Sequence, residues 1–173
     1  MGAEETVRAR MVDGLREGGR VRSTAVEAAF RAVPRHVFLP DEPLDRAYAD
    51  EAVATQFVDG VATSSASQPS MVAIMLEQLD LRPGQRVLEI GAGTGYNAAL
   101  IAHLVGPAGS VVSVDIDAGL VEQAGRQLAA AGMTGVELVT ADGALGYPPR
   151  APYDRIVLTV GSDDVRPEWI GQL

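Results

Sequence analysis

The sequence predicts an α/β fold with a doubly wound, mostly parallel β-sheet, and three observations carry that prediction. A short apolar run at residues 87–90 carries one acidic residue and leads into a glycine-rich turn. A largely apolar segment, residues 97–105, follows that turn. Further apolar strand patterns then alternate with helical ones. Such alternation is typical of βαβ units, in which helices connect parallel strands.

The first part of the chain predicts two helices. Residues 4–17 carry apolar side chains at helical spacing. Thr24 and Glu27 are spaced as in a capping box, which predicts a second helix that runs to Pro34.

The next part shows weaker periodicity. Residues 34–40 begin and end with proline and are expected to be extended. Residues 41–60 are expected to form a loop with a short strand, anchored by Tyr48, Phe57 and Val58.

A segment rich in hydroxyl groups lies directly before the predicted sheet. Residues 63–70 contain four serines and one threonine, and Pro69 is suited to the first turn of a following helix. One interpretation is an ordinary capped loop. The other is that these hydroxyl groups, which are more than one cap needs, donate hydrogen bonds to a carboxylate or to a bound cofactor.

The glycine turn is the strongest local signal. Gly91, Gly93 and Gly95 are spaced G-x-G-x-G, so the third glycine comes one residue earlier than in the dinucleotide fingerprint. Glu89 precedes them, and Asp115 ends the next predicted strand, where a carboxylate can accept both hydroxyls of a ribose. This set indicates S-adenosylmethionine (SAM), with its methionine carboxylate near the turn amides. The alternative is a purely structural turn.

The pattern continues with a helix at residues 120–131 and a third strand at residues 136–140. Asp142 and Gly143 follow that strand, at the end of the sheet where α/β proteins bind ligands. Asp142 is therefore expected to accept a hydrogen bond from an adenine amine, and the alternative is a polar turn. A fourth strand at residues 156–160 is apolar enough to be central in the sheet.

Domain organisation follows from this order. We expect a helical and loop cap over residues 1–60 and a SAM-binding core over residues 61–173, within one structural domain. Because strand four would remain as a long apolar edge, we expect either that the chain is truncated after it or that an extra segment or chain covers it.

Composition narrows the function classes. The 173 residues carry a net charge of −9, which argues against nucleic acid as a partner. No apolar run reaches the ~18 residues of a membrane span. The chain has no cysteine and only two histidines, so we expect no metal site and a cytoplasmic location.

Together these segments resemble the protein-L-isoaspartate O-methyltransferase family of SAM-dependent enzymes, over about residues 21–173. The matching segments are residues 33–38, 47–50, 65–71, 87–96, 113–117, 141–143 and 151–154. The resemblance implies a Rossmann-like fold, SAM as cofactor, S-adenosylhomocysteine as product, and a protein or peptide substrate methylated on an aspartyl or isoaspartyl carboxylate. It places Ser67 on the active-site serine of the family. The expected cofactor contacts are Ser65, Ser70, Glu89, Gly91, Ala92, Gly93, Gly95, Asp115, Ile116, Asp142 and Gly143.

The chain departs from the family in two places. The family's serine segment usually reads Thr-Ile-Ser-x-Pro, whereas residues 65–69 read Ser-Ala-Ser-Gln-Pro. This is similar to relatives that methylate an aspartate of a ribosomally made peptide, which then closes to an aspartimide. The family also has further C-terminal strands, so a non-catalytic SAM-binding or interaction module is the other alternative.

The implied acceptor is a carboxylate with a pKa of about 4, which is ionised at neutral pH and requires no general base. Ser67 is then expected to position it. An amine methyltransferase of nucleic acids would typically carry Asn/Asp-Pro-Pro-aromatic after strand four, where residues 159–162 read Thr-Val-Gly-Ser. A small-molecule O-methyltransferase would need a metal or histidine base that is not evident, and the glycine spacing argues against a nicotinamide dehydrogenase.

Overall fold

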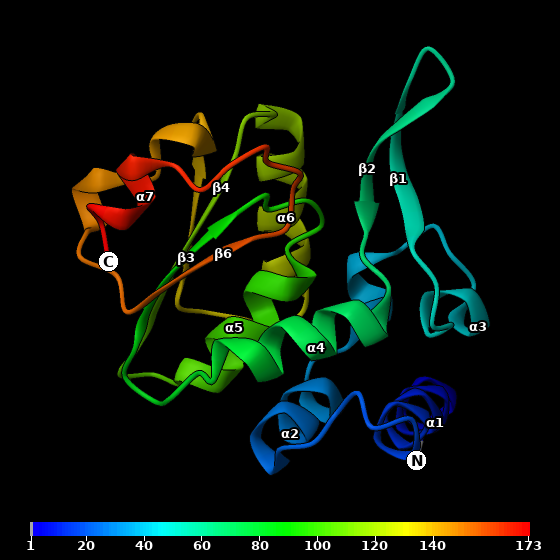
Figure 1. The fold of residues 1–173 in the computed structure, drawn as a ribbon. Coiled ribbons are helices and arrows are strands. Elements are labelled where there is room, and N and C mark those ends of the chain that lie inside the picture. Colours follow the sequence, from blue (N-terminus) through cyan, green and yellow to red (C-terminus); the bar gives the residue numbers. More distant parts are fainter. Residues whose placement is uncertain (1) are drawn as a thin grey trace. The chain divides into compact units, whose positions relative to one another are not determined.

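The computed structural model describes residues 2–173 and divides into two compact units, Met1–Asp80 and Leu81–Leu173 (Figure 1). The sequence suggested a boundary after residue 60. The division lies later because β2 (Val61–Ala66) pairs with β1 (Val53–Val58), and α4 (Pro69–Leu79) contacts the N-terminal helices. Among the described residues, no helix has both the length and the apolar character needed to cross a membrane.

Helices α1 (Ala3–Glu17), α2 (Thr24–Ala32) and α4 form the helical core of the first unit. Their buried apolar side chains recur at helical spacing and include Met11, Val12, Leu15, Val26, Phe30, Val72 and Leu76. Burial of such a stripe is what stabilises helices of this length.

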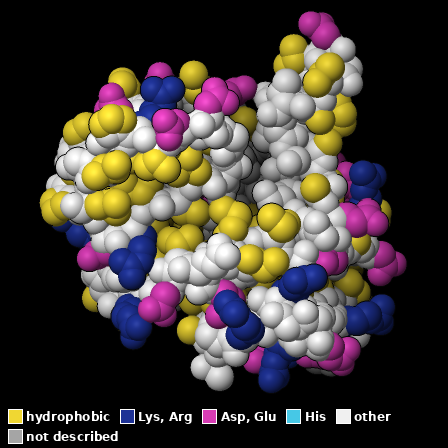
Figure 2. Space-filling view, in the orientation of Figure 1, with side chains coloured by type: hydrophobic (Ala, Val, Ile, Leu, Met, Phe, Trp, Pro, Cys, Tyr) yellow, Lys and Arg dark blue, Asp and Glu magenta, His cyan; other side chains and the backbone are white. Residues whose placement is uncertain are grey.

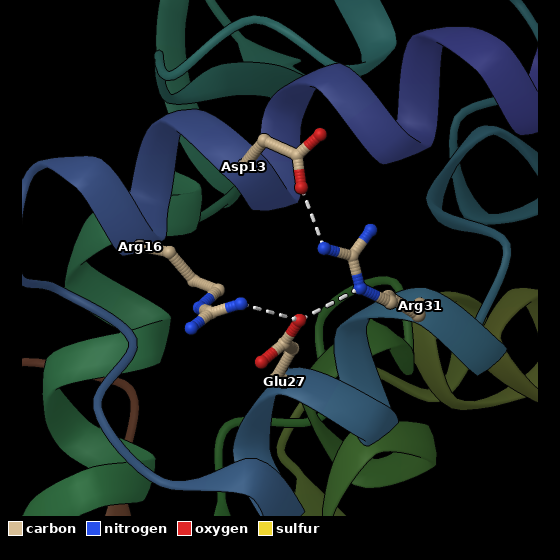
Figure 3. Close-up of polar contacts among 4 residues, drawn as sticks. All are labelled: Asp13, Arg16, Glu27 and Arg31. Carbon is tan, nitrogen blue, oxygen red and sulfur yellow. Dashed lines mark hydrogen bonds and ion pairs between the residues drawn. The ribbon is translucent and has the colours of Figure 1, made fainter.

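The start of α2 differs from the predicted capping box by one residue. Ser23, not Thr24, is the cap, because the Ser23 Oγ accepts a hydrogen bond from the Val26 amide at 3.2 Å. Glu27 faces the charged side chains of α1 and α2 instead of closing a box. Its Oε1 lies 3.3 Å from Arg16 Nη1 and 3.0 Å from Arg31 Nε, and Arg31 also contacts Asp13 (Figure 3).

The segment between α2 and β1 is more ordered than predicted. Residues expected to be extended form the 3₁₀ helix η1 (Arg35–Phe38), and the expected loop contains the short helix α3 (Leu44–Ala47). The extended prediction was wrong because Arg35 and Phe38 both face the interior, which a tight helical turn allows.

The serine segment begins as a strand, which the loop interpretation did not predict. β1 and β2 form an antiparallel hairpin, and Ser64 and Ser65 lie within it. Tyr48 is buried as expected, but Phe57 and Val58 are 62% and 53% exposed and anchor nothing. Backbone pairing, rather than burial of apolar side chains, defines this end of the hairpin.

The second unit is a parallel sheet of four strands in the order β5-β4-β3-β6. The strands are β3 (Arg86–Ile90), β4 (Ser110–Asp115), β5 (Val136–Thr140) and β6 (Arg155–Leu158). Register pairs Leu88 with Val112 and with Ile156. The strand expected to be central, β6, is an edge of the sheet in the part of the chain that the structure describes.

Helices lie on both faces of this sheet. α5 (Tyr96–Val105) and α6 (Ala118–Ala130) contact β3, β4 and β5, and they cover one face. Side chains alternate along a strand, so the other face carries a second cluster. That cluster contains Leu88, Ile90, Val112, Val114, Tyr153 and Trp169 of α7 (Pro167–Ile170). This is the predicted doubly wound arrangement.

Candidate functional site

The glycine turn joins β3 to α5 and is tied to the neighbouring strand. The amides of Gly91 and Ala92 both donate to the carbonyl of Val114, at 2.8 and 3.1 Å. Gly91, Gly93 and Gly95 all have positive φ, at 102°, 50° and 83°. Residues other than glycine rarely adopt this backbone conformation, so the three-glycine pattern follows from the shape of the turn.

At this turn, the atoms that lie closest to the glycines belong to the protein itself. A Cβ on Gly91 would lie 2.5 Å from Val160 Cγ1 and 2.7 Å from Thr159 Oγ1, at the end of β6. A Cβ on Gly95 would lie 3.2 Å from Ala124 Cβ of α6. The sequence favoured close approach of a ligand as the reason for these glycines. The structure shows that Gly91 and Gly95 let the turn pack against protein atoms, namely those of residues 159–160 and of α6.

Asp115 ends β4 and holds the turn from the other side. Its Oδ2 accepts a hydrogen bond from the Gly93 amide at 3.1 Å, and its Oδ1 accepts one from the Asp117 amide at 3.1 Å. A carboxylate accepts several bonds at once, so these contacts orient Asp115 and leave lone pairs for a ligand.

A cavity of about 350 Å³ opens at the carboxyl ends of the strands, within the size range of small-molecule sites. Five of the predicted cofactor residues line it, namely Gly91, Asp115, Ile116, Asp142 and Gly143. Ile116 is 76% exposed, so an apolar side chain lies beside the carboxylate expected to bind ribose.

Asp142 and Gly143 form the wall contributed by the end of β5. The Asp142 Oδ1 accepts a hydrogen bond from the Ala144 amide at 2.9 Å. A Cβ on Gly143 would collide with Ile90, so this glycine is needed for packing against β3. The Gly143 carbonyl accepts a hydrogen bond from Trp169 Nε1 at 2.8 Å. Trp169 therefore fixes this wall.

Other lining residues were not predicted. Val160, Ser162, Asp163, Arg166 and Trp169 come from the segment after β6. This segment reaches the strand ends because of the path that the chain takes after β6. It carries no sequence motif that would have indicated a place in the cavity. The cavity thus combines two predicted carboxylates, Asp115 and Asp142, with an unpredicted carboxylate, Asp163, and an unpredicted cation, Arg166.

Glu89 lies beneath the turn rather than in the cavity wall. It is fully buried, and its two oxygens accept hydrogen bonds from Asn97 Nδ2 at 2.7 Å and Ser113 Oγ at 2.5 Å. Burial raises the pKa of Glu89 to about 7, although both hydrogen bonds oppose that shift. Glu89 thereby links β3, β4 and α5. The predicted contacts Ala92, Gly93 and Gly95 likewise lie in the turn and not among the cavity-lining residues.

The predicted serines lie in the first unit. Ser65 is exposed in β2, Ser67 is half-buried after it, and Ser70 is buried in the first turn of α4. The Ser67 carbonyl accepts a hydrogen bond from Arg35 Nη2 at 3.0 Å. The Ser70 amide donates to Asp50 Oδ1 at 2.8 Å. Arg35 and Asp50 belong to segments that carried the family resemblance, but their contacts were not predicted.

Comparison with known proteins identifies the same family that the sequence segments resemble. The model of the family described as protein-L-isoaspartate(D-aspartate) O-methyltransferase matches residues 6–173. A protein-L-isoaspartate O-methyltransferase of Methanopyrus kandleri is 44% identical over 167 residues, which are 96% of this chain and 72% of the relative. The Pyrococcus horikoshii protein of the same name is 42% identical over 95% of this chain and 71% of its own length.

Solved structures agree. One protein-L-isoaspartate O-methyltransferase superposes with a TM-score of 0.87 at 38% identity, and it covers 95% of this chain. This chain spans about half of that protein, 51% of its length. A Plasmodium falciparum structure, described as a putative enzyme of this kind in complex with S-adenosyl-L-homocysteine, has a TM-score of 0.79 at 16% identity over all of this chain and 80% of its own. That likeness shows the fold alone.

These matches confirm the predicted fold, enzyme class and cofactor class. The Rossmann-like sheet with its glycine turn is that of SAM-dependent methyltransferases. The family match extends further toward the N-terminus than the segments that first indicated it. The chain belongs to the protein-L-isoaspartate O-methyltransferase family.

Proposed function

We propose that this chain transfers a methyl group from SAM to the side-chain carboxylate of an isoaspartyl residue in a protein or peptide. The observation that carries the proposal is the cavity at the strand ends, which two predicted carboxylates line within a chain that matches the family over residues 6–173. Its volume of about 350 Å³ suits a nucleoside. Asp115 and Asp142 would accept hydrogen bonds from the ribose hydroxyls and the adenine amine.

The residues fit SAM in chemistry as well as in size. The amides of Gly91, Ala92 and Gly93 already donate to protein acceptors, so the part of this region that would favour an anionic carboxylate is the N-terminal end of α5. Bound SAM supplies an electrophilic methyl group on a positively charged sulfur. The acidic character of Asp115 and Asp142 suits a ligand of net positive charge.

The chain is required to align the acceptor rather than to activate it. The substrate carboxylate has a pKa of about 4 and is ionised at neutral pH, so no residue has to remove a proton. Ser67 would donate a hydrogen bond that orients the carboxylate toward the methyl group. The methyl ester then closes to a succinimide when the next backbone nitrogen displaces methanol, and hydrolysis gives aspartate or isoaspartate.

The experiment is titration calorimetry with SAM and S-adenosylhomocysteine, followed by transfer of labelled methyl groups to an isoaspartyl peptide. We expect Asp115→Ala to weaken SAM binding at least about tenfold, because a ribose-binding carboxylate is lost. Glu122→Ala, on the exposed surface of α6, is the control and should leave binding unchanged. Tight SAM binding by the Asp115 variant would refute the assigned cofactor site.

The serine segment favours a second candidate substrate. Ser65 and Ala66 depart from the family's usual residues, so a dedicated precursor peptide with an ordinary aspartate is the alternative. The same assay with matched aspartyl and isoaspartyl peptides separates the two. Methylation of the isoaspartyl peptide alone would support protein repair, methylation of the aspartyl peptide alone would support peptide modification, and SAM binding without methylation would support an interaction module.

We also propose that a further strand, from a continuing segment or from another chain, pairs with β6. Within the described residues, β6 pairs only with β3. Apolar residues near this edge are exposed, and Figure 2 shows a broad hydrophobic group where α7 lies. The exposed large apolar side chains in the chain after β6, which includes α7, are Val160, Val165, Ile170 and Leu173. The absence of cysteine supports a reducing, cytoplasmic location.

A further inference from the structure

We infer that Arg35 and Asp50 are positioning residues that hold the turn around Ser67 in the geometry that methyl transfer requires. The Ser67 turn is defined here as residues 66–70, from the last residue of β2 to the first turn of α4. The inference rests on the proposed function, and it assigns no direct substrate contact to either residue.

Arg35 is fully buried, with 0% of its surface exposed. Its Nε donates a hydrogen bond to the Ala47 carbonyl at 2.8 Å, and its Nη2 donates one to the Ser67 carbonyl at 3.0 Å. These contacts join η1, the end of α3 and the Ser67 turn. Arginine is suited to this because its donors form a rigid, planar fork.

Burial of a charged group is unfavourable unless its donors are hydrogen-bonded. Methionine could fill a similar space without that penalty, so simple packing does not explain an arginine at this position. What Arg35 adds is a fixed separation between two backbone carbonyls that lie far apart in the sequence. One of those carbonyls belongs to Ser67.

Asp50 holds the other side of the same turn. Its Oδ1 accepts a hydrogen bond from the Ser70 amide at 2.8 Å, and its backbone carbonyl accepts one from Gln68 Nε2 at 2.9 Å. The backbone is therefore tied at Ser67 and again at Ser70. These ties restrict the backbone dihedral angles that set the direction of the Ser67 hydroxyl.

Alignment is the contribution that this reaction needs. Because the acceptor carboxylate is already ionised, the rate depends on how well the attacking oxygen and the methyl group are aligned. A misplacement of ~1 Å can reduce a rate by about 100-fold. A turn that positions Ser67 is therefore part of the catalytic apparatus even where its residues do not touch the substrate.

The first experiment compares Arg35→Met and Arg35→Lys with Arg31→Met. Arg31 is a matched control because it makes ion pairs on the exposed surface of the same unit (Figure 3). We expect Arg35→Met to lower kcat/KM for an isoaspartyl peptide by about 100-fold, with SAM affinity within about twofold of the parent. Arg35→Lys should be intermediate because one ammonium group cannot reproduce the fork. Arg31→Met should be unchanged in both measurements.

The second experiment uses Asp50 variants, so that the test of the inference does not depend on whether the arginine variants fold. Asp50→Ala removes the acceptor of the Ser70 amide, whereas Asp50→Asn retains an oxygen and should rescue activity. Each variant is also made in a Ser67→Ala background. If Arg35 and Asp50 act through Ser67, their substitution should cause little further loss there.

Equal losses in both backgrounds would show a merely structural role and would overturn the inference. So would folded Arg35→Lys and Asp50→Ala variants with the parent kcat/KM. A parent chain that binds SAM but methylates no peptide would refute the proposed function, and the inference with it. An active parent with unaffected variants would overturn the inference alone.

Discussion

Glu89 is a carboxyl group placed where water cannot reach it. It is 0% exposed and hydrogen-bonded to Asn97 and Ser113, beneath the glycine turn. Burial raises its pKa from 4.5 to about 7 in the folded protein. The sequence associated Glu89 with the cofactor. In the structure its role is to link β3, β4 and α5 beneath the glycine turn.

The raised pKa makes stability depend on pH in a defined direction. Between pH 4.5 and about 7 the unfolded chain loses the Glu89 proton while the folded chain keeps it. The effect of Glu89 on the free energy of unfolding is therefore most favourable below pH 4.5. As the pH rises toward 7, this effect lowers the free energy of unfolding by about 3 kcal/mol in total. Glutamine cannot ionise, so the Glu89→Gln variant lacks this pH dependence. Its free energy of unfolding relative to that of the parent should therefore increase across that interval.

Trp169 is the single tryptophan and lies in the second unit, so its fluorescence during urea unfolding measures the relevant stability. Glu122→Gln, on the exposed surface, is the control for loss of a carboxylate. Parallel pH profiles for the parent and Glu89→Gln would contradict the assignment of a raised pKa.

At the scale of elements, the β3–turn–α5 unit is held by the three glycines and by Asp115. Gly91 has φ of 102° and lies against Thr159 and Val160 of the segment after β6. The turn therefore depends both on a local backbone conformation and on close packing with a distant part of the chain.

Gly91→Ala should destabilise the second unit by about 3 kcal/mol, because strain at positive φ adds to overpacking. Gly132→Ala is the matched control, since Gly132 has φ of 67° but no atom within 4 Å of an added Cβ. Strain alone should make that change cost about 1 kcal/mol. Urea unfolding followed by Trp169 fluorescence measures both variants, and equal effects would show that packing at Gly91 contributes nothing.

For the molecule as a whole, the open edge of the sheet is the feature with consequences for association. A sheet edge next to exposed apolar side chains promotes pairing with another chain. The net charge of −9 opposes association but is spread over the whole chain.

We expect the 18.1 kDa chain to self-associate as its concentration rises, as measured by size-exclusion chromatography with light scattering. Ile170→Lys places a charge in the apolar group of α7 and should suppress association while SAM binding is retained. Val58→Lys, on the exposed hairpin of the first unit, is the control. A monomer at every concentration, or equal suppression by the control, would refute a role for this edge in self-association.

Much of the second unit was predictable because its signals are local. The third strand was predicted at the observed residues, and the glycine turn, Asp115 and Asp142 all lie at strand ends as expected. Alternation of strands and helices and the spacing of glycines depend on neighbours in sequence, which a single chain displays directly. The first unit was less predictable. The helix η1 and the hairpin of β1 and β2 show weak periodicity and are defined by contacts with other elements.

The family, the parallel sheet and five of the residues that line the cavity at the strand ends could be predicted from the sequence alone, because each is encoded in a short local pattern. The folded structure was needed to show that Glu89 is buried, that Arg166 and Trp169 line the cavity, and that Arg35 and Asp50 contact the Ser67 turn. Those facts depend on residues that are distant in sequence and become neighbours only when the chain has folded.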